Sequence, residues 1–194
     1  MIHDLFLCLG LVSKAPPAII TGDVQSIKNF DLIAFSGVIC SLDVDRNGKT
    51  ETFFVSEARG WRDEWIDGQW VAYEVLSKRI NKIVGDDTIQ VTSYYFSFST
   101  KENTPVFFVS VGFLDVIRDS VMDIAVASWN DEGFSRLVLY DLSGIEGRER
   151  PEIAELVPGL KWASYEIVWP LVKAKSPYGT REYVWENGDW VELE

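Results

Sequence analysis

The sequence has few of the residues from which most active sites are built. It contains one histidine, His3, and two cysteines, Cys8 and Cys40, among 194 residues. It has no Walker A loop, no dinucleotide-binding glycine motif, and neither a C-x-x-C nor an H-E-x-x-H pattern. A Ser-His-Asp or Cys-His set needs a well-placed histidine, which the lone His3 near the N-terminus does not supply. We therefore expect no enzymatic activity and assign no catalytic residue.

The two cysteines are too few for a disulfide framework. They leave two alternatives, one Cys8–Cys40 bridge in an oxidising compartment or two buried thiols among apolar neighbours.

Long apolar runs are also absent. No run is long enough for a transmembrane helix, so we expect no membrane insertion. Residues 5–12 are apolar like the core of a signal peptide, but Asp4 precedes them and no Lys or Arg does. We therefore expect residues 1–29 to be an apolar N-terminal segment that packs on a β domain of residues 30–194.

Positive charge is scarce. The chain has 18 Lys and Arg against 30 Asp and Glu, a formal net charge of −12. Contacts to phosphates need clustered Lys and Arg, so this balance argues against nucleic acid and against anionic membrane surfaces. Residues 78–82 form the only basic cluster, which we interpret as a solvated turn. The acidic surplus fits a cation ligand or a basic protein partner.

Aromatic residues, by contrast, are abundant: they make up 13% of the chain and include 8 Trp. Large aromatics suit pleated, half-buried surfaces, so the composition favours a mainly β fold. Alternating apolar runs between turn residues predict strands at 32–42, 52–56, 69–76, 89–97, 106–113, 124–128, 136–142 and 161–168. Asn187-Gly188 between alternating residues predicts a hairpin over 183–193. A helix is expected only at 151–156, where Pro151 would open it.

An acidic loop at residues 43–51 is the clearest chemical motif. Its carboxylate and amide side chains occupy relative positions 1, 3, 5 and 9, with Gly48 at position 6. Ca²⁺ takes six to eight oxygen ligands, which alternate residues of a tight loop can supply where a glycine makes the sharp turn. A weaker copy at residues 115–123 has carboxylates at positions 1, 5 and 9, from Asp115, Asp119 and Asp123. We interpret the second loop as a weak or lost metal site. For the first loop the alternative is a hairpin turn whose carboxylates are solvated, and for the second it is a metal-free structural loop.

The two loops mark an internal repeat. The apolar run at 52–56 corresponds to 124–128, and the run at 70–76 corresponds to 136–142. Residues 92–94 then correspond to 163–165. Each unit reads as four strands with an acidic loop after the first, which is the content of a propeller blade. We therefore predict two four-stranded antiparallel blade-like units at about 30–101 and 102–170, followed by a closing hairpin at 181–194.

The pattern Asp-x-Asp-x-Asn-Gly-x-x-Glu between two strands resembles the calcium loop of FG-GAP/VCBS-type repeats, the blade units of integrin-α-like propellers. The resemblance covers roughly residues 30–170. It implies a calcium site whose five ligands are the side chains of Asp43, Asp45, Asn47 and Glu51 and the backbone carbonyl of Lys49. Two units are too few to close a propeller, so the resemblance implies a curved sheet, a sandwich or assembly with another chain.

Tryptophans in the segments between strands are the candidate partner-binding residues. Trp61 and Trp65 are expected in a variable loop, and Trp129 in the equivalent loop of the second unit. Trp is frequent at binding hot spots, although such indoles can also fold back to cap a sheet. We therefore predict a calcium-stabilised, non-enzymatic interaction module with a protein or glycan partner, exported or on the cell surface. The alternatives are an acidic inhibitor or immunity-type protein and a carbohydrate-binding module.

Overall fold

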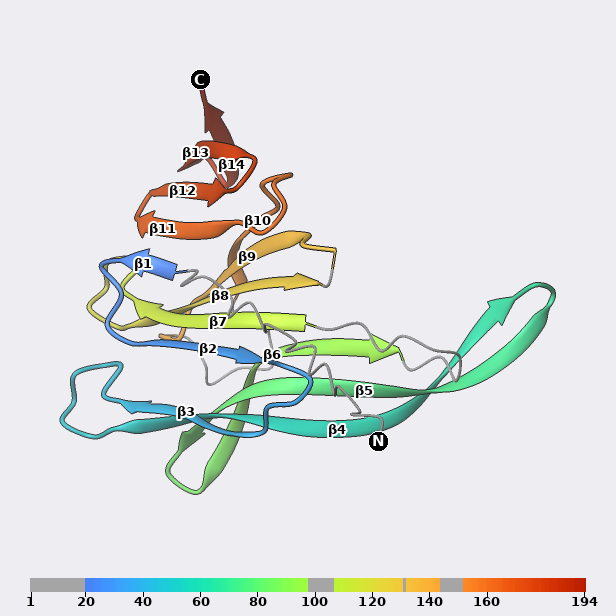
Figure 1. Ribbon diagram of the computed structural model, residues 1–194. Coiled ribbons are helices and arrows are strands. Elements are labelled where there is room, and N and C mark those ends of the chain that lie inside the picture. Colours follow the sequence, from blue (N-terminus) through green and yellow to red (C-terminus); the bar gives the residue numbers. More distant parts are fainter. Residues whose placement is uncertain (1–19, 98–106, 131, 144–151) are drawn as a thin grey trace, which may run out of the picture.

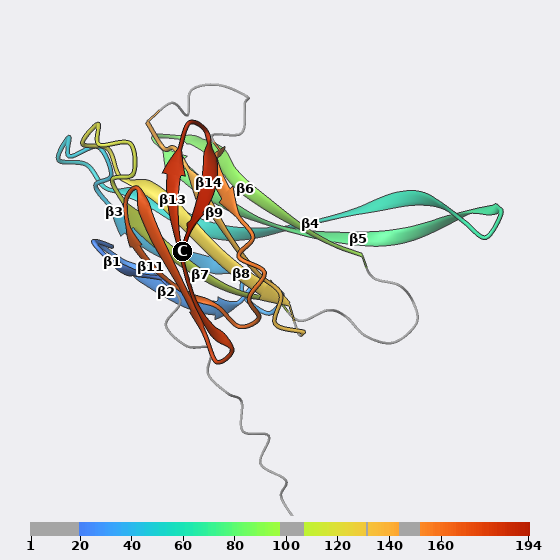
Figure 2. The same ribbon diagram turned by 90° about the horizontal axis from the view of Figure 1, so that it is seen from above.

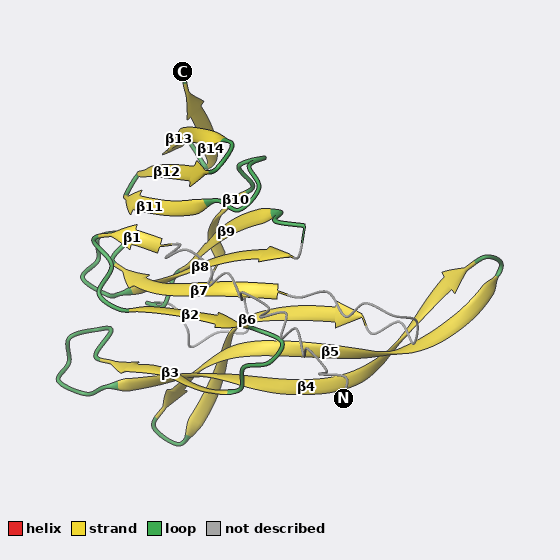
Figure 3. Ribbon diagram, viewed as in Figure 1, coloured by secondary structure: helices red, strands yellow, loops and turns green. Residues whose placement is uncertain are grey.

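The computed structural model describes residues 20–97, 107–130, 132–143 and 152–194, and these residues form strands, turns and loops (Figure 3). The predicted mainly β class is confirmed. The described residues include no helix that is long and apolar enough to cross a membrane. His3, Cys8 and the apolar run at 5–12 lie outside the described residues, as does most of the expected N-terminal segment.

The strands form three sheets, which are stacked along the molecule (Figure 1). The first sheet, in the order β3-β4-β5-β6, comprises β3 (Gly37–Leu42), β4 (Glu51–Ile66), β5 (Gln69–Val84) and β6 (Asp87–Ser97). The central sheet, in the order β10-β9-β8-β7-β2, comprises β2 (Ile27–Asp31), β7 (Phe107–Leu114), β8 (Asp123–Asn130), β9 (Ser135–Tyr140) and β10 (Glu152–Leu156). The C-terminal sheet, in the order β1-β11-β12-β13-β14, comprises β1 (Ile20–Gly22), β11 (Ser164–Val168), β12 (Leu171–Ser176), β13 (Gly179–Glu186) and β14 (Asp189–Leu193).

Each sheet contains four consecutive strands that run antiparallel to their neighbours, namely β3–β6, β7–β10 and β11–β14. The two N-terminal strands are added at the edges of other sheets. Strand β2 pairs antiparallel with β7, and β1 pairs parallel with β11. The start of the described chain therefore ties the central sheet to the C-terminal sheet.

The central sheet is covered on both faces. Strand β8 is buried from Asp123 to Trp129 because its alternate side chains enter two different apolar clusters. Ile124 and Val126 pack with residues of the first sheet, whereas Ala125 and Ala127 pack with residues of the C-terminal sheet. A strand buried on both faces reads as a continuous apolar run, as residues 124–127 do.

The expected strand at 32–42 is wrong in its first half, because the chain turns there. Strand β2 ends at Asp31, whose carboxylate accepts hydrogen bonds from the backbone N–H groups of Ile33 and Ala34. Phe35 stacks on Phe30 with ring centroids 4.5 Å apart. This turn moves the chain from the central sheet to the first sheet. Residues 21–29, expected to belong to the N-terminal segment that packs on the β domain, contain most of β1 and the start of β2.

The variable loop expected around Trp61 and Trp65 is also wrong, because β4 and β5 pair without a register shift from Thr52–Ile83 to Ile66–Gln69. The turn consists of Asp67 and Gly68, both with positive φ, as in a type I′ hairpin. Strand β3 covers β4 only up to Val55. The rest of this hairpin, residues 57–78, is called the arm here. Its outer part projects away from the three sheets (Figure 2).

The helix expected at 151–156 is replaced by strand β10, which pairs with β9. Ala154 and Leu156 are buried, whereas Glu155 points outward and forms an ion pair of 2.6 Å with Arg136. This alternation has a period of two, which six residues were too few to distinguish from a helical turn.

The fourth strand of the second expected unit differs from the prediction. Residues 92–94 lie in β6, the fourth strand of the first sheet, but residues 164–165 lie in β11 of the C-terminal sheet. The strand that follows β9 in the central sheet is instead β10. Strands β13 and β14 pair across Asn187 and Gly188, as one part of the four consecutive strands β11–β14.

Candidate metal loop and tryptophan arm

The loop at residues 43–51 joins β3 to β4 and is held by its own side chains. The carboxylate of Asp43 accepts hydrogen bonds from the backbone N–H groups of Asn47 (3.0 Å) and Gly48 (2.9 Å). Asp45 accepts a third from the N–H of Asn47 at 3.1 Å. Arg46 and Gly48 have φ of 58° and 85°, so the chain curls tightly around the two carboxylates.

Three of the expected ligands converge. Asp43, Asp45 and Glu51 each offer a carboxylate oxygen, and these oxygens lie within 4.8 Å of one another. Two ligands on opposite sides of a Ca²⁺ ion lie about 4.6–5.2 Å apart, because each Ca–O distance is about 2.3–2.6 Å. The spacing of the three carboxylates is therefore compatible with a hard cation.

The other expected ligands are in the same loop but less free. The side chain of Asn47 accepts a hydrogen bond from the N–H of Lys49 (2.8 Å) and donates one to Asp45 (2.7 Å). Lys49 is exposed on this loop. Glu51 accepts the N–H of Val44 at 3.0 Å, and its other oxygen lies 3.9 Å from the ammonium of Lys82. A cation would therefore compete with Lys82 for Glu51.

The loop at residues 115–123 joins β7 to β8 and has the same framework. Its fourth and sixth residues, Arg118 and Ser120, have φ of 59° and 72°. The sixth N–H is donated to the first carboxylate, from Ser120 to Asp115 at 3.2 Å. The second N–H is donated to the ninth carboxylate, from Val116 to Asp123 at 2.8 Å, as from Val44 to Glu51 in the other loop.

The expected second ligand set does not converge in the same way. Asp115 has one buried oxygen without a hydrogen-bond partner among the described atoms, but Asp119 uses its carboxylate to accept the N–H of Val121 at 2.9 Å. Asp123 is fully buried, and its two oxygens accept three backbone N–H groups. The third of these N–H groups belongs to Leu142, so Asp123 connects its loop to the end of β9.

Burial raises the pKa of Asp123 from 3.8 to about 6, even though the backbone hydrogen bonds from Val116, Ile117 and Leu142 favour the ionised form. The two loops also touch, because the N–H of Met122 donates to the carbonyl of Val44 at 2.7 Å. The loop at residues 43–51, called the metal loop here for its candidate ligands, is thereby anchored to the neighbouring sheet.

The arm carries three exposed tryptophans on one of its two faces. Trp61 and Trp65 lie on β4, and Trp70, which sequence reasoning missed, lies directly opposite Trp65 on β5. They are 78%, 59% and 70% exposed, and the rings of Trp65 and Trp70 meet edge to face with centroids 5.4 Å apart. On β4 this face continues the side that buries Phe53 and Val55 in the core, because alternate residues of a strand share a face.

Trp129 is wrong as a partner-binding residue. It is only 3% exposed and stacks on Phe108 at a centroid distance of 5.6 Å. It belongs to the core between the central and C-terminal sheets. The loop expected around it is partly strand, because β8 continues to Asn130, and Asp131 lies outside the described residues.

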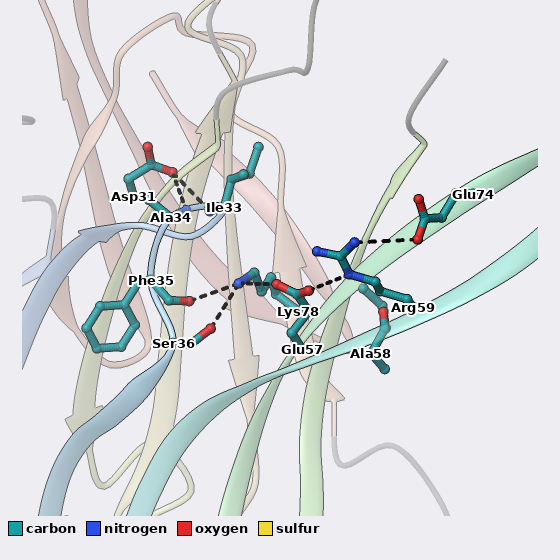
Figure 4. Close-up of polar contacts among 11 residues, drawn as sticks. Asp31, Ile33, Ala34, Phe35, Ser36, Glu57, Ala58, Arg59, Glu74 and Lys78 are labelled. Atoms are coloured by element: carbon teal, nitrogen blue, oxygen red, sulfur yellow. Dashed lines mark hydrogen bonds and ion pairs between the residues drawn. The ribbon is translucent and has the colours of Figure 1, made fainter. Parts of the chain in front are cut away.

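The base of the arm is fixed by Lys78, whose ammonium is buried beside the turn between β2 and β3 (Figure 4). Its Nζ donates to the carbonyl of Phe35 at 3.2 Å and to the hydroxyl of Ser36 at 3.0 Å, and pairs with Glu57 at 3.0 Å. Hydrogen bonds from Arg59 and then from Lys78 lower the pKa of Glu57.

The predicted solvated turn at 78–82 is therefore wrong. These residues lie within β5, and Lys78 and Lys82 are both buried with carboxylate partners.

Compared with known proteins, the chain matches no family model, no curated protein and no solved structure. The resemblance to FG-GAP/VCBS-type repeats therefore depends on the sequence pattern of the loop and stays a prediction.

Proposed function

We propose that this chain is a non-enzymatic β-repeat interaction module, stabilised by Ca²⁺ in the loop at residues 43–51. The observation that carries the proposal is the convergence of Asp43, Asp45 and Glu51 within one loop. Carboxylates this close repel one another, and a bound cation relieves that repulsion. An ion that binds only the folded chain raises its stability by mass action.

The matching framework of the two loops supports the repeat. Each loop joins the first and second of four consecutive antiparallel strands, and each has left-handed residues at its fourth and sixth positions. Each also makes the same two backbone-to-carboxylate bonds. We therefore propose β3–β6 and β7–β10 as two divergent blade-like units, with the C-terminal hairpin inside a third set of the same strand order.

The first loop is the better metal site for a chemical reason. Gly48 occupies its left-handed sixth position at no steric cost, whereas Ser120 adopts that conformation in the second loop. Ile117 stands where the first loop has Asp45, which removes one oxygen ligand. The buried Asp123 is committed to backbone N–H groups. We assign calcium to the first loop and a structural role to the second.

The interaction surface of this module is the arm. Exposed tryptophans on a paired hairpin suit the recognition of a partner, because each buries a large area at low entropic cost. The same exposure of Trp61 and Trp65 favours carbohydrate binding as a second candidate function. Quenching of Trp fluorescence by oligosaccharides tests this second candidate, and unchanged fluorescence across a glycan panel would exclude it.

Calcium binding is tested by thermal unfolding with Ca²⁺ and with EDTA. At a free Ca²⁺ concentration of 100 times the dissociation constant, we expect stabilisation of about 2.7 kcal/mol. This corresponds to a rise in Tm of about 5–10 °C for a chain of this size. Asp45→Ala should lose most of the rise, because it removes one of the converging carboxylates.

Asp119→Ala is the matched control, because it removes a carboxylate from the second loop and should keep the calcium-dependent rise. If EDTA leaves the Tm of the parent unchanged, or if Asp45→Ala responds to Ca²⁺ like the parent, the ligand assignment is wrong. Millimolar Ca²⁺ outside cells would fill such a site, which favours an exported or surface location.

A further inference from the structure

The arm has one open edge. Strand β3 pairs with β4 up to Val55, and no strand in the described part of the chain pairs with that side of β4 from Ser56 to Ile66. In a hairpin closed by a two-residue turn, the flanking pair, here Ile66 and Gln69, is the hydrogen-bonded one. Because β4 and β5 pair without a register shift, the odd-numbered residues from 57 to 65 direct their N–H and C=O groups outward. This edge is a template for another strand.

We propose that the edge pairs with the same edge of a second copy of this chain. The two β4 strands would run antiparallel about a twofold axis at Trp61, with Ser56 opposite Ile66 of the other copy. This proposal names the partner of the arm. It depends on the proposed function only in that the arm is the interaction surface, and it needs no calcium.

The length of the free edge selects this register. The edge begins after Val55, the last residue of β4 that β3 covers, and ends at Ile66 before the turn. Trp61 is its midpoint, so pairing about Trp61 uses the whole edge of both copies. A twofold axis at Gly60 or earlier would bring the end of the second β4 against Val55, where β3 already lies. Strand β4 of the second copy would then lie along the same side of β4 as β3, directly beyond the end of β3.

Charge selects the same register. About Trp61, Arg59 of each copy lies opposite Asp63 of the other, while Glu57 faces Trp65. A twofold axis at Gly60 would place Glu57 of one copy opposite Asp63 of the other. An axis at Arg59, Arg62 or Asp63 would place that residue opposite its own copy, so that two identical charges meet. Like charges directly opposite one another destabilise a pair of strands. Of these five registers, only the one about Trp61 opposes no like charges.

The aromatic face adds apolar contacts to this pairing. Trp61 is 78% exposed and would meet its own copy at the axis, with the Trp65–Trp70 pairs on either side. The arm is held in position for this by the buried ammonium of Lys78 at its base. Pairing about a twofold axis uses the edge of each copy once, so the assembly closes as a dimer and does not grow into a fibre.

Sedimentation velocity of the parent over a range of concentrations, at an ionic strength of about 0.15 M where long-range repulsion is screened, measures the dimer. We expect the dimer fraction to rise with concentration. Arg59→Asp should shift the chain to monomer, since it opposes two aspartates, and Asp63→Arg should do the same. The double variant Arg59→Asp/Asp63→Arg should restore the dimer, because it exchanges the charges and recreates both pairs.

Disulfide trapping tests the register directly. In a background with Cys8→Ser and Cys40→Ser, Trp61→Cys should form a covalent dimer on mild oxidation, because two residues at a twofold axis come within bonding distance. Trp70→Cys is the control: it also replaces an exposed tryptophan but lies on β5, away from the edge.

Three outcomes would overturn the proposal: a parent that stays monomeric up to about 100 µM, a double charge variant that stays as monomeric as the single ones, or equal trapping of Trp61→Cys and Trp70→Cys. A parent that stays monomeric but whose fluorescence responds to oligosaccharides would assign the arm to glycans instead. Removal of calcium by EDTA should leave the dimer in place, because the metal loop is at the opposite end of β4 (Figure 1). Failure of the calcium proposal is thereby distinguishable from failure of this one.

Discussion

At the scale of single residues, Asp123 combines complete burial with a carboxylate that accepts three backbone hydrogen bonds. Its pKa is raised from 3.8 to about 6, mainly by burial. At a pH between these two values the carboxyl of Asp123 is protonated in the folded chain and ionised in the unfolded chain. This contribution to stability is therefore fully present below about pH 4 and is lost as the pH rises through 6.

We predict that Asp123 contributes less to the free energy of unfolding as the pH rises. Its contribution should fall by up to about 3 kcal/mol between pH 4 and pH 7. Urea denaturation at several pH values measures it, with Asp123→Asn as the variant that cannot titrate. The pH profile of the parent minus that of Asp123→Asn should slope downward over this range. A flat difference would show that the carboxyl titrates alike in the folded and unfolded chains.

Two buried tyrosines on neighbouring parts of the C-terminal sheet offer a matched comparison. Tyr183 donates its hydroxyl to the carbonyl of Pro158 at 3.0 Å, whereas the hydroxyl of Tyr165 has no partner among the described atoms. Both rings are buried, at 5% and 1% exposure. Removal of a satisfied hydroxyl loses a hydrogen bond, while removal of an unsatisfied one relieves a desolvation penalty.

We therefore predict that Tyr183→Phe lowers the free energy of unfolding by about 1 kcal/mol and that Tyr165→Phe leaves it unchanged or raises it. Chemical denaturation of both variants gives the comparison. A larger loss for Tyr165→Phe than for Tyr183→Phe would contradict the hydrogen-bond assignment.

At the scale of the elements, the arm depends on the ion pair at its base. Glu57 is the counterion of the buried Lys78, whereas Arg59, which also bonds to Glu57, is 67% exposed. A buried charge that loses its partner is costly, but an exposed one is solvated by water.

Glu57→Ala should therefore lower the free energy of unfolding by about 2 kcal/mol, reduced from the full cost of a buried pair because Glu57 is itself partly exposed. Arg59→Ala should cost much less, because its guanidinium is exposed to water. Urea denaturation of both variants tests this difference. Equal losses would mean that Lys78 finds another partner or that the base of the arm contributes nothing to stability.

Many of the strands were predicted from the sequence, but their lengths were not. Alternation placed strands at 52–56 and 69–76, and these lie inside β4 and β5, each of which continues much further. Charged residues among the tryptophans of 60–70 resembled a loop, because an arm exposed on both faces has no apolar alternation. The Asp67-Gly68 pair was the signal that could have revealed the hairpin.

Other errors arose from contacts distant in the sequence. Nothing local to Trp129 indicates whether its ring faces solvent, since its burial depends on the C-terminal sheet. The same holds for Lys78, which looks solvated in sequence but is buried against the turn after β2. The convergence of Asp43, Asp45 and Glu51 was predictable, because these residues and Gly48 lie within nine consecutive positions.

At the scale of the whole molecule, three stacked sheets enclose two apolar clusters, and the loop at residues 43–51 and the arm lie at opposite ends of β4. The loop is bonded to its counterpart in the next sheet through Met122 and Val44. An ion in the loop would therefore stabilise the junction of two sheets as well as one turn, which is why we expect its removal to lower the Tm of the whole chain.

The most direct test of this account is the calcium content of protein purified without a chelator, measured by elemental analysis. We predict about one Ca²⁺ per chain for the parent and for Asp119→Ala, since six to eight oxygen ligands are needed and, within the described part of the chain, only the first loop brings three carboxylates together. Asp45→Ala should contain almost none. A parent without calcium, or equal calcium in the parent and in Asp45→Ala, would contradict the assignment.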